Sequence, residues 1–259
     1  MSVARHESPS AVEDRWGRTS EGHPEDGFFA AAYRSWFRVE WEGLENIPED
    51  GGALLVSNHS GMMPVDGGLI QHGIQVERGR AVYMLAHHGF FRIPFMGRTL
   101  NRIGSVVAHP DNAHRLLAED GRLVLVFPEG AKGPVKPASE RYRLQRFGRG
   151  GFVETAMRAG VPIVPIALMG TEDSTPTAAQ LNLGGQAMPI TWNSLLLGPV
   201  LGAVAHLPVK IRARALPPIE FEGPSDSRSL LMDRAELVRG RMQDALDDLY
   251  RNRRSLWEG

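Results

Sequence analysis

Short apolar runs alternate with amphipathic stretches through the middle of the chain, and this alternation predicts most of the fold. Runs of about four to eight apolar residues bounded by glycine, proline or polar residues are typical of buried strands. Strands that alternate with helices of about ten residues favour an α/β domain with a mostly parallel central sheet flanked by helices. The predicted strands are residues 53–57, 82–86, 105–108, 122–127, 163–168 and 209–215, and the predicted helices are residues 64–73, 111–120 and 151–160.

Residues 226–259 at the end of the chain predict an amphipathic helix. Between Leu231 and Leu249 the apolar residues recur at spacings of four and three, and charged residues fill the other faces. A single apolar stripe of this kind packs a helix on its own domain or pairs two copies in a dimer. We expect the first, with residues 1–27 as a polar, disordered tail and residues 28–225 as the one folded domain.

Two apolar segments fit either the protein core or a lipid surface. Aromatic residues crowd between Phe28 and Trp41, which predicts an element packed on the core or a segment at a membrane interface. From Ser174 to Val209 the chain has no Asp, Glu, Lys or Arg, and it contains the interrupted apolar stretch Leu195–Ala205. This stretch is too short to span a bilayer. We expect it in the core; the alternative is an apolar surface that touches lipid or lines an acyl-chain groove.

Charge and composition exclude several classes of function. Lys and Arg number 29 against 30 Asp and Glu, a net charge of −1, so no basic field attracts nucleic acid. The chain has no cysteine, which excludes disulfides, thiolate metal sites and a cysteine nucleophile. The first 27 residues lack the apolar core of a secretory signal, and no apolar run reaches the roughly 18 residues of a membrane-spanning helix.

His59 and Asp66 are the first candidates for chemistry. His59 follows the predicted strand 53–57, and functional groups of α/β sheets gather beyond the carboxyl ends of strands. A histidine acts as a general base when a nearby carboxylate orients its ring and stabilises the imidazolium. The same residues are compatible with a turn histidine and an ordinary first-turn carboxylate, which the helix dipole favours.

A second group follows the predicted strand 122–127, where Glu129 and Gly130 place a carboxylate and a flexible backbone beyond the strand end. The alternative is a simple turn with an exposed glutamate. A run of cations comes next, which is either a solvated face or a site for phosphate or anionic headgroups. Its members are Lys132, Lys136, Arg141, Arg143, Arg146 and Arg149, with Glu140 as the only acid among them.

Other motifs are absent. The adjacent His87 and His88 have no evident third ligand, so we expect no metal site. The chain contains no G-x-S-x-G nucleophile elbow, no phosphate-binding G-x-x-x-x-G-K-[ST] loop and no H-E-x-x-H zinc motif.

Four blocks, taken together and in order, resemble the motifs of the glycerolipid and lysophospholipid acyltransferase superfamily. The resemblance covers roughly residues 40–220 and makes residues 28–225 an acyltransferase domain. It implies an enzyme of lipid metabolism that attaches peripherally to the cytoplasmic side of a membrane and uses no cofactor. The four blocks are Asn58-His59 with Asp66, Phe90–Gly104 with Pro94 and Gly97, Phe127-Pro128-Glu129-Gly130, and Val161-Pro162-Ile163-Val164-Pro165-Ile166.

The resemblance also implies a mechanism. The donor is an acyl thioester on coenzyme A or acyl carrier protein, and the acceptor is a hydroxyl of a glycerolipid or lysophospholipid. His59 is the general base and Asp66 orients its ring, while Asn58, Glu129 and Gly130 bind substrate. The hydroxyl attacks the thioester directly, without a covalent enzyme intermediate.

Three departures from the superfamily pattern affect the acceptor. Six residues separate His59 from Asp66 where four are usual, and no Asp-Arg pair follows Gly104. Ala131-Lys132 stands where Thr-Arg is frequent. The resemblance therefore implies that a phosphate contact has moved to Lys132, Arg141 or Arg143, or that the acceptor is a neutral glyceride or another lipid alcohol. The alternatives are a lipid or thioester hydrolase and a non-catalytic lipid-binding protein on the same fold.

Overall fold

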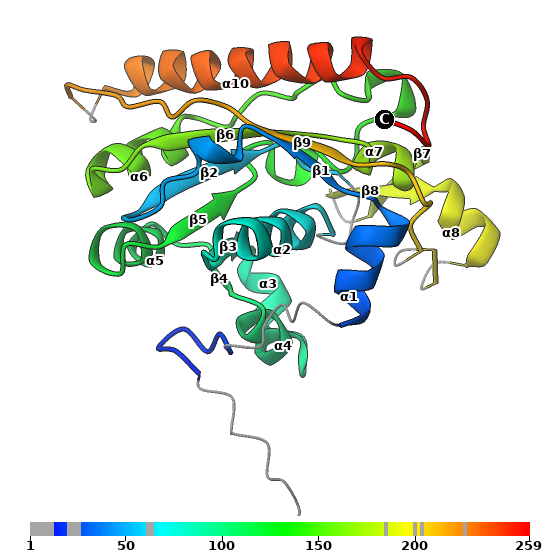
Figure 1. The fold of residues 1–259 in the computed structure, drawn as a ribbon, viewed down its shortest axis with the longest axis horizontal. Helices are drawn as coiled ribbons and strands as arrows, with labels where there is room; N and C mark the ends of the chain where they lie inside the picture. Colours follow the sequence, from blue (N-terminus) through cyan, green and yellow to red (C-terminus); the bar gives the residue numbers. More distant parts are fainter. Residues whose placement is uncertain are drawn as a thin grey trace, which may run out of the picture.

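The computed structural model describes residues 13–19, 27–60, 65–183, 186–198, 201–202, 205–224 and 227–259. A seven-stranded sheet in the order β1-β9-β6-β2-β5-β3-β4 forms its centre. The strands from β6 to β4 in this order are parallel, whereas β9 runs antiparallel to β6 and parallel to β1. A separate antiparallel hairpin is formed by β7 and β8 (Figure 1). The strands are β1 Glu40–Glu42, β2 Ala53–Ser57, β3 Val82–Ala86, β4 Ser105–Val107, β5 Leu123–Val126, β6 Ile163–Met169, β7 Thr177–Leu183, β8 Gln186–Thr191 and β9 Arg212–Ala215.

The central strands are buried on both faces, which explains their continuous apolar runs. Every residue of β2 and of β6 is buried. Side chains that alternate along β2 enter two different cores: Leu54 and Val56 lie in one cluster, and Ala53 and Leu55 lie in the other. The sheet therefore needs a layer of helices on each side.

The helices supply these two layers (Figure 1). The cluster on one face includes residues of the π-helical turn after α5, of α6 and of α10, and the cluster on the other face includes residues of α2 and of the turn after α1. The predicted apolar stripe of the C-terminal helix is buried from Leu231 to Leu249, and α10 packs on β6 and α6 of its own domain. The helices are α1 Phe28–Ala31, α2 Val65–Arg78, α3 His88–Phe91, α4 Met96–Arg102, α5 Pro110–His114, α6 Gly151–Ala159, α7 Thr171–Ser174, α8 Trp192–Leu197 and α10 Arg228–Arg251, with π-helical turns at Ala32–Trp36 and Arg115–Glu119 and 3-10 turns at Leu44–Asn46, Gly130–Lys132 and Ala138–Glu140.

The predicted fold class, a single α/β domain with a mostly parallel sheet, is confirmed. All six predicted strands exist, although β9 begins three residues later than residue 209. The sequence analysis missed β1, because its three residues Glu40, Trp41 and Glu42 form a short edge strand without an apolar run. It also missed β7 and β8, which lie in the uncharged segment from Ser174 to Val209.

The prediction of a disordered tail over residues 1–27 is wrong for residues 13–19, which pack on the domain. The Trp16 indole Nε1 donates a hydrogen bond to Asp120 Oδ2 at 2.7 Å. The buried Arg18 guanidinium donates to Gln75 Oε1 at 2.9 Å and to the carbonyl oxygen of Val82 at 3.3 Å. These two side chains anchor a segment that looks merely polar in the sequence. Residues 1–12 and 20–26 lie outside the described residues.

The prediction of a buried core for residues 195–205 is also wrong in the described part. Leu195, Leu196 and Leu197 on α8 are 58%, 80% and 53% exposed, and Leu201 is 63% exposed. The helix has six residues, fewer than two turns, and buries Asn193 alone, so its leucines have no facing element. Residues 199–200 and 203–204 lie outside the described residues.

The aromatic segment from Phe28 to Trp41 is partly packed on the core and partly exposed. Tyr33 and Phe37 are buried in the core, whereas Phe28 is 92% exposed and Trp36 is about half exposed. In the described parts of the chain, no helix combines the length and the apolar character that crossing a bilayer requires.

Candidate active site

His59 and Asp66 lie side by side, although six residues separate them in the sequence. His59 is in the loop after β2, and Asp66 is in the first turn of α2. The distance from His59 Nδ1 to Asp66 Oδ2 is 2.7 Å. The Asp66 side chain is fully buried, and it also accepts hydrogen bonds from the backbone N–H groups of Ser60 and Gly67, both at 2.8 Å. Three donors therefore hold the carboxylate in one orientation.

This contact determines which nitrogen of His59 is basic. A carboxylate only accepts hydrogen bonds, so Nδ1 carries the proton toward Asp66 and Nε2 is left with its lone pair. Burial lowers the pKa of His59, but the charge and hydrogen bond of Asp66 outweigh it, and the pKa is raised above its ordinary value. Within the described residues, Nε2 has no hydrogen-bond partner. The arrangement can take a proton from a bound hydroxyl.

The packing around His59 keeps its ring in place. The imidazole stacks on Phe127, with ring centroids 4.5 Å apart and an angle of 24° between the planes. Gly133 lies so close that a Cβ there would be 2.8 Å from the His59 carbonyl oxygen and 3.1 Å from His59 Cβ. Any larger residue at position 133 would displace the histidine loop.

Glu129 converges on the same place from the end of β5. Its side chain is fully buried, and Oε1 accepts a hydrogen bond from the His59 backbone N–H at 3.2 Å. Oε2 accepts from the Gln145 backbone N–H at 2.8 Å and lies 3.4 Å from Lys136 Nζ. The protein itself occupies both oxygens, so in this structure Glu129 holds the backbone of the loop that carries His59.

Asn58 is likewise occupied by the protein. The residue is fully buried. Its side-chain amide donates to the carbonyl oxygen of Leu168 at 2.9 Å and accepts from the N–H of the same residue at 2.8 Å. The Asn58 amide thus joins the loop after β2 to β6 and offers no free polar group to a substrate.

The other predicted binding residues divide into two groups. Gly130 has a positive φ of 57°, and no atom lies within 4 Å of where its Cβ would be, so its backbone borders open space. Lys132 and Arg143 are exposed and form no ion pair with described residues. Arg141, by contrast, places a guanidinium nitrogen 3.0 Å from Asp173 Oδ1. The predicted basic run is therefore not one continuous surface.

The sequence analysis named Lys136 only as a member of the basic run and missed its ion-pair partner Glu172. Lys136 is the buried member of the basic run, and its Nζ lies 2.8 Å from Glu172 Oε1. Burial raises the pKa of Glu172, and the Lys136 ammonium group opposes this shift. Glu172 and Asp173 follow the end of β6 after two intervening residues, at the same sheet edge as His59 and Glu129, and this position after a strand was a signal in the sequence.

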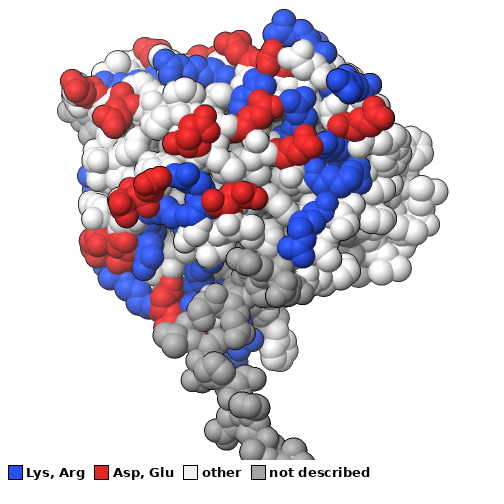
Figure 2. Space-filling model, viewed as in Figure 1, with Lys and Arg blue, Asp and Glu red and all other residues white. Residues whose placement is uncertain are grey.

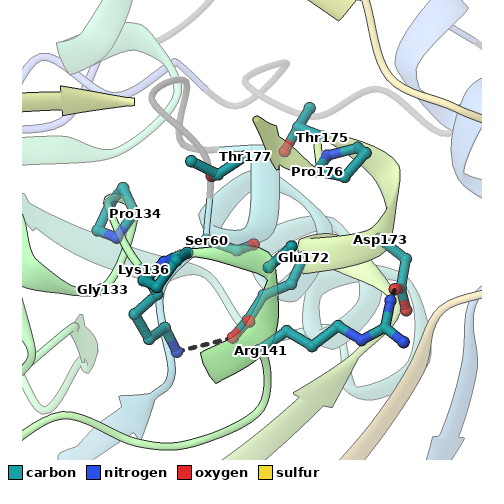
Figure 3. Close-up of a pocket in the computed structure, with 12 residues that line it drawn as sticks. Ser60, Gly133, Pro134, Lys136, Arg141, Glu172, Asp173, Thr175, Pro176 and Thr177 are labelled. Atoms are coloured by element: carbon teal, nitrogen blue, oxygen red, sulfur yellow. Dashed lines mark hydrogen bonds and ion pairs between the residues drawn. The ribbon is translucent and has the colours of Figure 1, made fainter. Parts of the chain in front are cut away.

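A small pocket with a cavity volume of about 30 Å³ lies beside the loop that carries His59, and Figure 3 shows residues that line it. Ser60, which follows His59 in the chain, and Gly133, which packs against His59, form part of its wall. The charged and hydroxyl groups that line it come mainly from the loops after β5 and β6: Lys136, Arg141, Glu172, Asp173, Thr175 and Thr177.

Metal binding has no support in the described ranges, where no three His, Cys, Asp or Glu side chains gather as a possible metal site. The rings of His87 and His88 lie 4.2 Å apart on the surface. His87 instead caps α3, accepting a hydrogen bond from the Gly89 N–H.

The fold and the site define an α/β protein with a histidine–carboxylate pair beyond the central strand of its sheet and a second carboxylate beside it. The chain belongs to the acyltransferase family, whose model, described as "Acyltransferase", matches residues 38–169. The resemblance that the sequence motifs indicated is thereby confirmed.

Individual relatives extend the comparison. An uncharacterized protein of Mycobacterium tuberculosis is 39% identical, over 88% of this chain and 66% of its own length. A Bos taurus protein named DGAT1/2-independent enzyme synthesizing storage lipids is 25% identical, over 85% of this chain and 67% of its own. This chain thus spans 66% of the mycobacterial relative.

A solved structure has the same fold. It is the crystal structure of the 1-acyl-sn-glycerophosphate acyltransferase PlsC from Thermotoga maritima, with a TM-score of 0.53 and 21% identity. The match covers 85% of this chain and 77% of that chain.

Proposed function

We propose that the protein is an O-acyltransferase that moves a fatty acyl group from an acyl thioester to a hydroxyl of a glycerolipid or lysophospholipid. The donor is acyl-CoA or acyl-ACP, and no further cofactor takes part. The observation that carries the proposal is the 2.7 Å contact between His59 Nδ1 and Asp66 Oδ2 within a domain of the acyltransferase family.

In the proposed reaction, His59 Nε2 removes the proton from the acceptor hydroxyl as its oxygen attacks the thioester carbonyl carbon. The tetrahedral intermediate collapses, the carbon–sulfur bond breaks, and the imidazolium returns the proton to the thiolate. Asp66 stays ionised and stabilises the imidazolium between these steps. Proton transfer of this kind contributes about 10²–10⁴-fold to the rate. No enzyme nucleophile is needed, which agrees with a chain that lacks cysteine.

Substrate binding is assigned to the groups that face open space. The backbone at Gly130 is available to a ligand, and the exposed Lys132 and Arg143 offer unpaired charges to the phosphates of a coenzyme A donor. Glu129 and Asn58 act indirectly by holding the His59 loop.

We further propose that the protein acts peripherally at a membrane, on its cytoplasmic side. The support is the exposed apolar surface on α8 and Leu201, in a segment without any charged residue from Ser174 to Val209. Figure 2 shows charged side chains scattered over most of one face, while the protruding part where α8 lies is white.

The names of the relatives agree with lipid acylation. The bovine relative is named for the synthesis of storage lipids, and the solved structure for acyl transfer to 1-acyl-sn-glycerophosphate. These names point to different acceptors, one neutral and one phosphorylated.

Substitution of His59→Ala tests the proposal. Purified protein is incubated with a radiolabelled long-chain acyl-CoA and a panel of lipid alcohols, and the products are separated. We expect the wild type to form labelled ester and His59→Ala to form none while keeping its thermal melting curve. The matched control is His88→Ala, an exposed histidine on α3, which should leave the rate unchanged.

Two outcomes of the same assay contradict the proposal. Release of labelled fatty acid whatever alcohol is supplied means a hydrolase. Binding of liposomes without any consumption of the thioester means a lipid-binding protein that does no chemistry.

A further inference from the structure

Helices α3 and α4 form one compact unit at the surface. The Met96 backbone N–H, at the start of α4, donates to the carbonyl oxygen of Ile93 at 3.2 Å, and a Cβ on Gly97 would lie 3.1 Å from the carbonyl oxygen of Phe91. The two helices therefore pack closely against each other. Figure 1 shows this unit next to the edge strand β4, on the side of the sheet opposite to α10.

Large apolar side chains gather on the outside of this unit. Phe95 is 85% exposed, Ile93 is 48% exposed and Phe90 is 43% exposed. Single exposed apolar residues are ordinary, but here three fall within the six positions from Phe90 to Phe95. Phe95 also has a φ of 65°, in the left-handed region that bulky residues rarely adopt. The fold thus holds the Phe95 ring in solvent at a cost in backbone conformation.

The same unit is basic in a chain that is close to neutral overall. No Asp or Glu occurs between Glu77 and Asp111. Arg92 and Arg98 are exposed, and neither forms an ion pair with a described residue. Their charges are therefore available to an anionic partner. We call the exposed apolar and cationic residues of this unit the α3–α4 surface, namely Phe90, Arg92, Ile93, Phe95 and Arg98.

A mixture of protruding apolar side chains and arginines is typical of a surface that binds an anionic membrane. The apolar side chains enter the boundary between headgroups and acyl chains, and the arginines attract anionic headgroups. An acidic protein would pair with the arginines as well, but it would need a complementary cavity for each protruding side chain. A bilayer accepts such side chains without a preformed cavity, so these features favour a lipid surface.

The topology connects this surface to the edge of the sheet that carries the proposed base. β2, β5 and β3 are parallel, so their carboxyl ends share one edge. His59 is the second residue after β2, and α3 begins at the second residue after β3. The chain also reaches α8 from that edge, through α7 and the β7–β8 hairpin after β6. Both exposed apolar surfaces thus follow strands that end at the edge of His59.

We propose that the α3–α4 surface is a second membrane contact, separate from α8, and that it selects bilayers that contain anionic lipid. The proposal rests on the peripheral attachment proposed above and adds a contact with a charge preference. Phe90, Ile93 and Phe95 insert below the headgroups, and Arg92 and Arg98 bind the lipid phosphates.

Flotation with two kinds of vesicle tests the charge preference. One kind is phosphatidylcholine alone, and the other is phosphatidylcholine mixed with anionic phosphatidylglycerol. We expect the wild type to bind the anionic vesicles more tightly. The double variant Arg92→Gln with Arg98→Gln should bind them about 25-fold more weakly, because each arginine near an anionic surface contributes about fivefold. Its binding to neutral vesicles should not change, and high salt should remove the difference from the wild type.

The matched control for the charges is Arg228→Gln with Arg241→Gln, two exposed arginines of α10, which should bind both kinds of vesicle like the wild type. Phe95→Ala tests the apolar part. It should weaken binding to both kinds of vesicle about tenfold, because the ring leaves water when it inserts. Leu237→Ala on α10 is its control and should have no effect. All these side chains are exposed, so the melting temperatures should stay unchanged.

The outcomes separate this proposal from the proposed function. Equal binding of the wild type and the Arg92/Arg98 variant to anionic vesicles overturns the charge preference, and equal binding of Phe95→Ala and Leu237→Ala overturns the insertion. If the arginine variant keeps its vesicle binding but its KM rises for acyl-ACP and not for acyl-CoA, the surface binds a carrier protein and the proposal is wrong. Failure of the wild type to bind any vesicle overturns the membrane attachment as well, whereas acyl transfer is decided independently by ester formation.

Discussion

Replacing Asp66 by asparagine removes one charge and one acceptor from the centre of the site while keeping the side-chain shape. The native carboxylate accepts three hydrogen bonds, from His59 Nδ1, the Ser60 N–H and the Gly67 N–H, at 2.7, 2.8 and 2.8 Å. An amide has one oxygen and one NH₂ group, so it cannot accept all three.

Both orientations of the asparagine amide impair catalysis. If its oxygen faces His59 and Ser60, its NH₂ group opposes the Gly67 N–H and the start of α2 is strained. If its NH₂ group faces His59, Nδ1 must become the acceptor and the ring proton moves to Nε2, where no base is left. In the Ser-His-Asp triad of serine proteases the same change costs about 10⁴-fold in kcat through this wrong tautomer. We expect a loss of about 10²–10⁴-fold here.

The pH dependence gives an independent readout. His59 must be neutral to act as a base, so the rate rises with pH through its pKa. Burial lowers this pKa and the Asp66 carboxylate raises it above its ordinary value. Removing the carboxylate removes the largest influence that raises this pKa, so in Asp66→Asn the acidic limb of the kcat/KM profile should move to lower pH.

Steady-state ester formation, measured across a pH series, checks both expectations. A suitable control is Asp111→Asn, because Asp111 is also a first-turn carboxylate beside a histidine, 3.5 Å from His109 Nδ1, but both side chains are exposed. It should leave the rate and profile unchanged. A loss below tenfold in Asp66→Asn, together with an unmoved acidic limb, would refute the pairing as a catalytic feature.

Three further predictions concern positioning, the packed N-terminal segment and the apolar surface. Glu129→Gln should lower kcat at least tenfold and lower the free energy of unfolding by about 1–3 kcal/mol in urea titrations. The reason is that the NH₂ group of the glutamine would face one of the two backbone N–H donors that bind the carboxylate. An unchanged kcat would show that the position of the His59 loop does not depend on Glu129. Trp16→Ala should cost about 1–3 kcal/mol by the same measurement, because Asp120 loses the indole donor. Leu196→Asp should weaken binding to liposomes in flotation assays without lowering the melting temperature, whereas Leu237→Asp, an exposed leucine on α10, should bind like the wild type. Equal binding by both variants would exclude α8 as the membrane contact.

The strands of the sheet could be predicted because parallel strands that are buried on both faces consist of continuous apolar residues. The five buried residues of β2 are an example. The position of His59 after that strand was equally visible. Its pairing with Asp66 was not, because a spacing of seven positions does not define the path of the intervening loop. Only the superfamily resemblance favoured it.

Charge and hydrophobicity alone do not predict burial where contacts with distant parts of the chain determine it. Lys136 and Glu172 are 36 positions apart, and nothing local distinguishes this buried lysine from its exposed neighbours Lys132 and Arg143. The leucines of α8 are as apolar as those of β2, and only the absence of a facing element leaves them exposed. The residue type therefore does not predict whether a side chain is buried, because burial depends on the elements that pack against it.

The strand order places three acidic and basic site residues at one edge of the sheet and leaves the opposite edge without them. Because β2 lies between β5 and β6, the segments bearing His59, Glu129 and Glu172 leave the sheet on one shared edge. Insertions at the opposite edge would leave these three residues in place. A single residue added within β2 would instead move the side chains of the rest of that strand to the opposite face of the sheet. The far rim of this domain can therefore change in length without moving these residues, whereas the lengths of three neighbouring strands determine where they lie.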